Sequence, residues 1–334
     1  MSFAPPAALM RAHLCRRYGG PDVIELAEIP RPLPKDDEVL IRIRATTVSA
    51  ADWRVRSLVM PPGFAPVARL ALGLMRPRQP ILGTELAGVV ERVGARVTRW
   101  RPGDAVIALP GGAMGCHAEY RAMAETGALA PKPANLGFEE AASLCFGGHT
   151  ALHFLRKAAI KPGESLLVIG AAGSVGGALV QLGRHFGAVV TGVTSTANVD
   201  LVTSLGATAV VDRTRRDVFS DGATYDVIAD TANTISFARA RAALNPGGRL
   251  LAIAGGMGEM LASLLPPRDG GKRVIAGPAE ERAEDVRLLA DLAARGVLRP
   301  VIDSRYRFED MRAAHARVET RRKSGSVVVS VAEA

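Results

Sequence analysis

The sequence is poor in cysteine, and the cysteines it has form no recognisable motif. Three occur in 334 residues, Cys15, Cys116 and Cys145. They contain no C-x-x-C pair and leave an odd number, which excludes a disulfide framework and a four-cysteine zinc lobe. This usage favours a reducing compartment, so we expect a cytoplasmic protein.

Long apolar runs are also missing. A membrane-spanning helix needs roughly 18 uninterrupted apolar residues. The nearest candidate, LVMPPGFAPVARLALGLM at residues 58–75, is broken by Pro61, Pro62, Gly63, Pro66 and Arg69. The N-terminus MSFAPPAALMRAH has two prolines and no long apolar core. We therefore expect neither a membrane span nor a signal peptide.

Aromatic residues make up only 4% of the chain, although its net charge is +9. A basic chain raises the question of a nucleic-acid partner. However, the arginines are dispersed, no block of five like charges occurs, and few rings are present for base stacking. The charge therefore predicts a solvated arginine-rich surface and no nucleic-acid partner.

Two patterns of hydrophobicity divide the chain. Short alternating segments separated by glycine and proline, such as DDEVLIRIRATTVS, ELAGVVERVG and DAVIALP, predict a β-rich region over about the first 130 residues. From about Glu139, helical and strand patterns alternate, which is typical of an α/β fold with a parallel sheet covered on both faces. The expected elements are a helix near 139–158, strand 165–170, helix 174–186, strand 188–193, helix 198–205, strands 208–212 and 225–230, helix 234–244 and strand 248–254.

The tail changes pattern again. A strand KRVIAG, a helix EDVRLLADLAARG, the segment PVIDSRY, a helix FEDMRAAHARVETRR and a strand SGSVVVSV follow one another. The simplest arrangement returns this tail to the β-rich part. We therefore expect one domain from residues 1–130 and 280–334, interrupted by a nucleotide-binding domain over 131–279.

A glycine-bearing turn lies between the strand near 165–170 and the following helix. A strand that ends at Gly170 and a helix that begins near Ser174 leave backbone N–H groups where the helix dipole favours a phosphate. In this pattern Gly173 lets a pyrophosphate approach the backbone, and Gly176 permits close helix packing. The alternative is an ordinary turn that needs small residues for packing. The predicted phosphate-binding residues are Ala171, Ala172, Gly173, Ser174, Val175 and Gly176.

Seven motifs occur in a characteristic order: YGGPDVIEL, VSAADWR, ILGTELAGVVERVG, RPGDAV, AAGSVG, SLGATAVVD and NPGGRLLAIAGG. Together they resemble the medium-chain dehydrogenase/reductase superfamily, and within it the zinc-free quinone oxidoreductase-like branch. The resemblance implies a chaperonin-10-like β domain joined to a Rossmann domain with a doubly wound parallel sheet, and an active site in the cleft between them. It also implies a homodimer paired through the edge of the Rossmann sheet, for which KRVIAG is the candidate strand.

The resemblance also locates the positions that bind catalytic zinc in related enzymes. They match Ser49, the pair Thr84–Glu85, and Phe146, which offer hydroxyls, one acid and a hydrocarbon ring. A catalytic zinc needs three Cys, His or acidic ligands. We therefore expect no zinc.

Cofactor choice is expected to depend on residues after the second strand of the Rossmann domain. Enzymes that use NAD usually place an acid there, and this chain has none until Asp200. Thr194, Ser195 and Asn198 supply neutral groups; in the family Ser195 matches a phosphate-contacting hydroxyl, whereas Asn198 replaces a frequent lysine. Arg213 replaces a tyrosine along the adenine, where it either pairs with a 2′-phosphate or is a solvated strand-end arginine. We expect NADPH, with NADH possible.

The resemblance places Thr150 beside the nicotinamide, and an N-cap or packing role is the alternative. It also assigns the carboxamide of the nicotinamide to the backbone of Ala254, Gly256 and Met257.

Ser49 and Asp52 match an Asn-x-x-Asp pattern of the quinone reductase branch, with serine in place of asparagine. Ser49 can donate to a substrate carbonyl, and Asp52 serves either as an acid or, more in keeping with its position, as a turn cap. His117 and His149 are candidate proton donors, with hydrogen-bonded structural roles as the alternative.

These features predict a zinc-independent, NADPH-dependent oxidoreductase that transfers hydride to a small hydrophobic quinone or α,β-unsaturated carbonyl compound. In this family residues 58–75 overhang the substrate, although a lid packed on its own domain or a dimer contact are alternatives. Two other functions stay open: a dinucleotide-binding protein with little turnover, and a zinc-free alcohol or aldehyde oxidoreductase.

Overall fold

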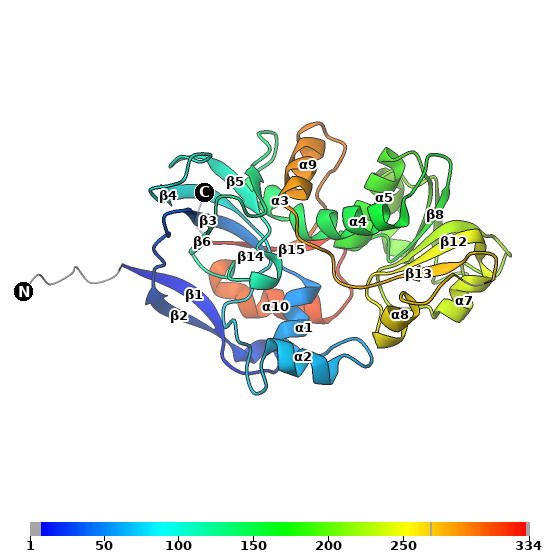
Figure 1. The fold of residues 1–334 in the computed structure, drawn as a ribbon, viewed down its shortest axis with the longest axis horizontal. Coiled ribbons are helices and arrows are strands. Elements are labelled where there is room, and N and C mark those ends of the chain that lie inside the picture. Colours follow the sequence, from blue (N-terminus) through cyan, green and yellow to red (C-terminus); the bar gives the residue numbers. More distant parts are fainter. Residues whose placement is uncertain (1–7, 268, 332–334) are drawn as a thin grey trace, which may run out of the picture.

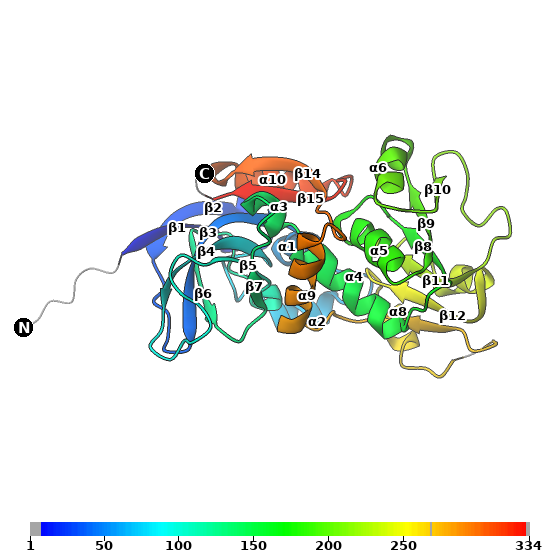
Figure 2. The ribbon, with the colours of Figure 1, turned by 90° about the horizontal axis from the view of Figure 1, so that it is seen from above.

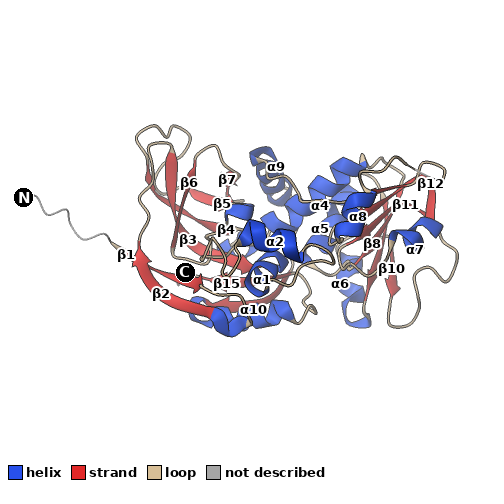
Figure 3. Ribbon diagram, turned by 60° about the horizontal axis from the view of Figure 1, so that its bottom comes forward, coloured by secondary structure: helices blue, strands red, loops and turns tan. Residues whose placement is uncertain are grey.

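The computed structural model describes residues 8–267 and 269–331, which form two lobes with helix α4 (Cys145–Ala158) between them (Figures 1 and 2). Strands concentrate in the two lobes, and most of the helices lie between the sheets (Figure 3). Among the described residues, no helix is long and apolar enough to cross a membrane.

The first lobe is built on a mixed sheet centred on β3 (Glu38–Val48). β3 pairs antiparallel with three strands, β4, β6 and β15. Its alternating residues Val39, Ile41 and Ile43 are buried in one apolar core, as their spacing predicts. The strands of this lobe are β1 (Leu9–Cys15), β2 (Ile24–Pro30), β3, β4 (Leu86–Val93), β5 (Ala105–Ala108), β6 (Tyr120–Ala124), β7 (Leu129–Pro131), β14 (Ile302–Arg307) and β15 (Ser326–Ser330).

The second lobe is a six-stranded sheet in which every pairing is parallel. Its central strand β8 reads SLLVI, a continuous apolar run of the kind expected when both faces of a sheet are covered. Leu166 and Val168 face one core, and Leu167 and Ile169 face another. In spatial order the strands are β10 (Ala209–Asp212), β9 (Val189–Thr194), β8 (Ser165–Ile169), β11 (Tyr225–Asp230), β12 (Leu244–Ala252) and β13 (Arg273–Ile275).

Helices cover the parallel sheet and fill the space between the lobes. The remaining helices are α1 (Ala50–Ser57), α2 (Ala65–Leu72), α3 (Phe138–Ala142), α5 (Ser174–His185), α6 (Val199–Ser204), α7 (Phe237–Ala242), α8 (Met257–Ala262), α9 (Ala283–Ala294) and α10 (Met311–Glu319).

The tail of the chain returns to the first lobe. β15 lies between β14 and β3 in the mixed sheet, although nearly 280 residues separate it from β3 along the chain. The parallel sheet is formed by segments between residues 165 and 275. The domain limits expected from the sequence, 1–130 with 280–334 around 131–279, stay a prediction.

The helix expected over 139–158 is wrong in one respect, because it is two helices, α3 and α4. At the break the Ser143 hydroxyl donates to the carbonyl of Glu140 at 2.8 Å. The Phe146 N–H, which would continue the helical ladder, donates instead to the Glu85 carboxylate at 2.6 Å. A partner 61 residues earlier therefore breaks the helix, and no local pattern shows it. The helix expected over 234–244 is likewise shorter, and β12 begins earlier than expected.

Candidate functional site

The predicted phosphate-binding turn connects β8 to α5. Gly170 has φ +79°, a conformation that favours glycine, and α5 begins at Ser174 after the extended residue Gly173. No side chain caps the N-terminus of α5. Its first N–H groups are thus directed at the turn without a side-chain partner, which fits an anion.

Two glycines of the turn have different constraints. A Cβ at Gly176 would lie 2.1 Å from the carbonyl oxygen of Gly170, so this position is restricted by the protein's own packing. A Cβ at Gly173 would meet only that oxygen, at 3.4 Å, an ordinary contact. The protein itself does not require glycine at 173, and the open space beside this backbone fits an approaching pyrophosphate.

A segment of the C-terminal tail contacts this turn. Gly325 N–H donates to the carbonyl of Ala172 at 2.8 Å, and the hydroxyls of Ser326 and Ser174 are 3.1 Å apart. No local pattern in the sequence predicts this contact, because it arises from the return of β15 to the first lobe.

The residues predicted to select the cofactor gather at the ends of β9 and β10. Arg213 N–H donates to the carbonyl of Thr194 at 2.8 Å, and the Asn198 amide donates to the Ser195 hydroxyl at 3.3 Å. The Ser324 hydroxyl donates to the Asn198 oxygen at 2.8 Å. The Arg213 side chain is exposed and has no hydrogen bond or ion pair to any described residue.

An acid missed by the sequence reading lies among these residues. Asp212 accepts hydrogen bonds from the hydroxyls of Thr196 and Thr214, both at 2.6 Å, and these bonds lower its pKa to about 2. The Thr196 hydroxyl proton is therefore engaged with this acid. This acid comes from β10, the strand beside β9, so the residues that follow β9 along the chain, as far as Asp200, do not reveal it.

On the expected nicotinamide side, Thr150 lies on α4 and its hydroxyl donates to the carbonyl of Phe146 at 2.8 Å. Two N–H groups of the 254–257 segment already have partners. Gly256 N–H donates to Glu259 at 2.9 Å, and Met257 N–H donates to the carbonyl of Pro62 at 2.9 Å. Met257 thereby connects the two lobes, and the Ala254 N–H makes no hydrogen bond to any described residue.

Ser49 and Asp52 form a capping box at the start of α1. The Ser49 hydroxyl donates to the Asp52 carboxylate at 2.6 Å, and Gly83 N–H donates to its other oxygen at 2.8 Å. Asp52 is fully buried. These contacts favour the capping role for Asp52. They also engage the proton of the Ser49 hydroxyl in a hydrogen bond to Asp52. Thr84 donates to Ser49 across a long 3.4 Å, so its hydroxyl is the less committed donor.

The four positions that match zinc ligands in related enzymes do lie close together. Besides the Ser49–Thr84 contact, the Glu85 carboxylate accepts from the Thr47 hydroxyl at 2.5 Å and from Phe146 N–H at 2.6 Å. Two hydroxyls, one carboxylate with both oxygens engaged and a phenyl ring do not make a zinc ligand set. The residues at these positions therefore do not fit this metal.

Glu85 is a titratable group whose importance the sequence did not show. Burial raises its pKa to about 7, against the lowering effects of the Thr47 hydroxyl, Phe146 N–H and the nearby Lys323 ammonium. Burial also lowers the pKa of Lys323 to about 8. An acid and a base that titrate near neutrality thus lie where the first lobe, α4 and the tail meet.

Both candidate histidines are buried and bound to backbone carbonyls. His117 Nε2 contacts the carbonyl of Thr47 at 3.0 Å, and His149 Nε2 contacts that of Glu280 at 2.6 Å. Burial lowers the pKa of His117. These contacts favour the structural alternative for both residues.

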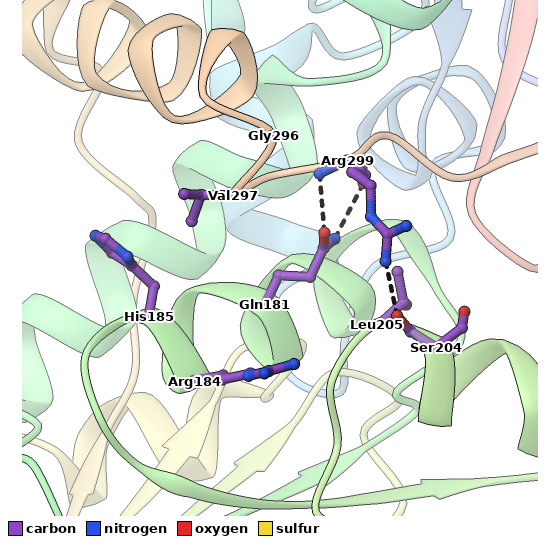
Figure 4. A pocket seen from close by; sticks show the side chains of 8 residues that line it. All are labelled: Gln181, Arg184, His185, Ser204, Leu205, Gly296, Val297 and Arg299. Atoms are coloured by element: carbon purple, nitrogen blue, oxygen red, sulfur yellow. Dashed lines mark hydrogen bonds between the residues drawn. The ribbon is translucent and has the colours of Figure 1, made fainter.

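A cavity of about 410 Å³ lies elsewhere, beside the second half of α5 (Figure 4). Gln181 bridges to the backbone of Arg299 on one side of it, and the Arg299 guanidinium donates to the carbonyl of Ser204 at 2.7 Å. None of the residues predicted for the site lines this cavity.

Comparisons with known proteins match both lobes. Residues 35–153 match the family described as alcohol dehydrogenase GroES-like domain, and residues 205–329 match the one described as zinc-binding dehydrogenase. The chain is 32% identical over 332 residues to the NADPH-dependent alkenal/one oxidoreductase of Arabidopsis thaliana, covering 96% of this chain and 79% of that protein. It is 31% identical over 327 residues to the quinone oxidoreductase of Sus scrofa, covering 92% of this chain and 93% of that protein.

Among solved structures, the quinone oxidoreductase from Coxiella burnetii has a similar fold. It superposes with a TM-score of 0.85 at 24% identity, covering 97% of this chain and 100% of that chain. The combination of a GroES-like domain with a Rossmann-type parallel sheet is thus confirmed.

The two glycines of the turn give a matched test. We expect Gly173→Val to abolish binding of a nicotinamide dinucleotide while Tm stays within about 2–4 °C of wild type, the shift that ~1 kcal/mol causes. Gly176→Val should lower Tm by more, because its Cβ meets backbone at 2.1 Å. Fluorescence titration and thermal unfolding measure both effects. Normal binding by Gly173→Val would mean that the phosphates lie elsewhere.

Glu85 predicts a pH dependence of stability. Its folded pKa of about 7 exceeds the value of roughly 4.3 in an unfolded chain, so the folded protein holds an extra proton between these values. The free energy of unfolding attributable to Glu85 therefore falls as pH rises through this window. The Tm of Glu85→Gln relative to wild type should increase between pH 5 and pH 8, whereas exposed Glu25→Gln should show no such trend. A difference in Tm between Glu85→Gln and wild type that does not change with pH would contradict the raised pKa of Glu85.

Proposed function

Because the chain belongs to the zinc-free quinone oxidoreductase-like branch of the medium-chain dehydrogenase/reductase superfamily, we propose that it is an NADPH-dependent reductase of quinones or α,β-unsaturated carbonyl compounds. The uncapped N-terminus of α5, with open space at Gly173, is the observation that carries the proposal. The relatives are named for quinone and for alkenal or alkenone substrates, which are related electrophilic acceptors.

The chain's own residues would bind and orient the reactants. A bound nicotinamide supplies the hydride. The N–H groups of Ser174, Val175 and Gly176 would hold the diphosphate, and Thr150 would lie beside the ring. The backbone of Ala254 is the freest part of the segment proposed for the carboxamide, because the N–H groups of Gly256 and Met257 are engaged.

The acceptor oxygen needs a hydrogen-bond donor as negative charge develops on it. Thr84 fits this role better than Ser49, because the Ser49 proton is held by the Asp52 carboxylate at 2.6 Å while the Thr84 hydroxyl makes only a 3.4 Å contact. In this proposal Asp52 and Ser49 are positioning residues. The proton that completes the reduction comes from solvent, since His117 and His149 are bound to carbonyls.

We also propose a homodimer. β13 lies at one edge of the parallel sheet, so a second copy can extend the sheet at this strand. A cytoplasmic location stays a prediction.

An activity screen tests the function directly. Purified protein should oxidise NADPH in the presence of quinones or enones, and excess chelator should leave the rate unchanged, because Ser49, Thr84, Glu85 and Phe146 do not form a zinc site. Thr84→Val should lower kcat by roughly 10²-fold or more, as loss of an oxyanion donor does. Turnover of saturated alcohols alone, or a requirement for zinc, would contradict the proposal.

Cofactor preference tests the adenosine site. Arg213 is the unpaired cation there, so Arg213→Ala should weaken NADPH binding by roughly tenfold, the effect of losing ~1.5 kcal/mol of charge-assisted hydrogen bonding. NADH binding should stay nearly unchanged, because NADH has no 2′-phosphate. Ser195→Asp should reverse the preference. Nicotinamide fluorescence titration measures each constant.

The control is Arg216→Ala, since the Arg216 guanidinium already contacts Asp221 at 3.5 Å and should not serve the cofactor. If wild type favours NADH, or if Arg213→Ala weakens both cofactors equally, the 2′-phosphate is assigned to the wrong residues.

A further inference from the structure

Helix α2 is an apolar helix that its own protein covers only in part. Its sequence is APVARLAL, and none of its residues is buried. Val67 and Leu70 are 54% and 66% exposed, and just beyond the helix Leu74 and Met75 are 64% and 88% exposed. Partly buried Leu72 packs against the core of the first lobe, so the expected alternative of a lid packed on its own domain stays open, although Val67 and Leu70 remain exposed.

A second exposed apolar segment lies beside α2 across the boundary between the lobes. α2 and α8 are neighbours in all three views (Figures 1–3). The Met257 N–H at the start of α8 donates to the carbonyl of Pro62 at 2.9 Å. At and beyond the end of α8, Leu261, Leu264 and Leu265 are more than half exposed. We call these exposed apolar residues of α2, α8 and their C-terminal flanks the apolar rim.

Positive charge accompanies the apolar rim. Residues 53–84 contain no aspartate or glutamate. Arg69 and Arg78 donate to the backbone carbonyls of Leu74 and Leu70 at 3.1 and 2.9 Å, which holds both guanidinium groups beside the apolar side chains. Arg76 is exposed and has no hydrogen bond or ion pair to any described residue.

The partner must accept both apolar side chains and arginines. Two copies related by a two-fold axis would present the same patch to each other, so arginines would approach arginines, and the only acid in residues 53–84 and 257–265, Glu259, already accepts from the Gly256 N–H. An anionic membrane surface accepts both groups, because apolar side chains enter the acyl boundary while cations contact headgroups. We propose that the apolar rim docks the protein reversibly on anionic lipid membranes.

The exposed residues of the rim are not among those proposed to bind the cofactor, so docking does not depend on what the protein reduces.

Vesicle binding tests the proposal without cofactor or substrate. Wild type should co-sediment with vesicles of phosphatidylcholine and phosphatidylglycerol (7:3) and far less with phosphatidylcholine alone. Leu70→Asp/Met75→Asp should reduce the partition coefficient by more than about tenfold. Arg76→Ala should reduce it by about fivefold. The matched control Leu26→Asp/Leu33→Asp, which changes two exposed leucines outside the rim, should bind like wild type.

Thermal unfolding and light scattering keep the outcomes distinct. All variants should keep the wild-type Tm, since the changed side chains are exposed. Failure of wild type to bind anionic vesicles, or equal binding by Leu70→Asp/Met75→Asp, would overturn the proposal. A smaller molar mass for that variant without vesicle binding by wild type would assign the rim to a second copy instead. None of these outcomes bears on reductase activity, so the two proposals fail independently.

Discussion

The buried carboxylate of Glu85 fixes the relation between the two lobes at the candidate site. Through one oxygen it binds the Thr47 hydroxyl of β3, and through the other it binds the Phe146 N–H at the start of α4. The second bond separates α3 from α4 and so sets where α4 begins. Thr150 lies one helical turn further on, and its hydroxyl donates to the carbonyl of Phe146. An isolated buried acid would be costly, and these two donors compensate for part of that cost.

Much of the fold could be predicted because its signals are local. Alternation identified β3, a continuous apolar run identified β8, and the spacing of small residues placed the turn before α5 within one residue. The phosphate site expected at this turn stays a prediction, and the structure shows that its two glycines differ in the space around them. The family was also predictable, since seven motifs in order specify far more than one glycine-bearing turn.

The missed features all depend on partners distant in the chain. The break before α4 needs Glu85, the acid near Ser195 comes from the neighbouring strand β10, and the Ser324–Ser326 segment reaches the turn from the tail. Residue type alone also misled the choice of hydrogen-bond donor. Ser49 offers a hydroxyl in sequence, but in the structure that proton belongs to Asp52. The sequence predicts which residues could take part in chemistry. Tertiary contacts decide which of their hydrogen-bond donors and acceptors are unoccupied.

The position of β15 has a consequence for the order in which the chain becomes structured. β15 lies inside the mixed sheet, between β14 and β3, yet its residues follow those of the whole parallel sheet along the chain. During translation the parallel sheet has all its strands once Ile275 has emerged, whereas β3 lacks one of its three partners until Ser330 does. The lobe that contains β3 is thus completed after the parallel sheet. Until then the edge of β3 is open, which makes this lobe the one that most needs protection from association with other nascent chains.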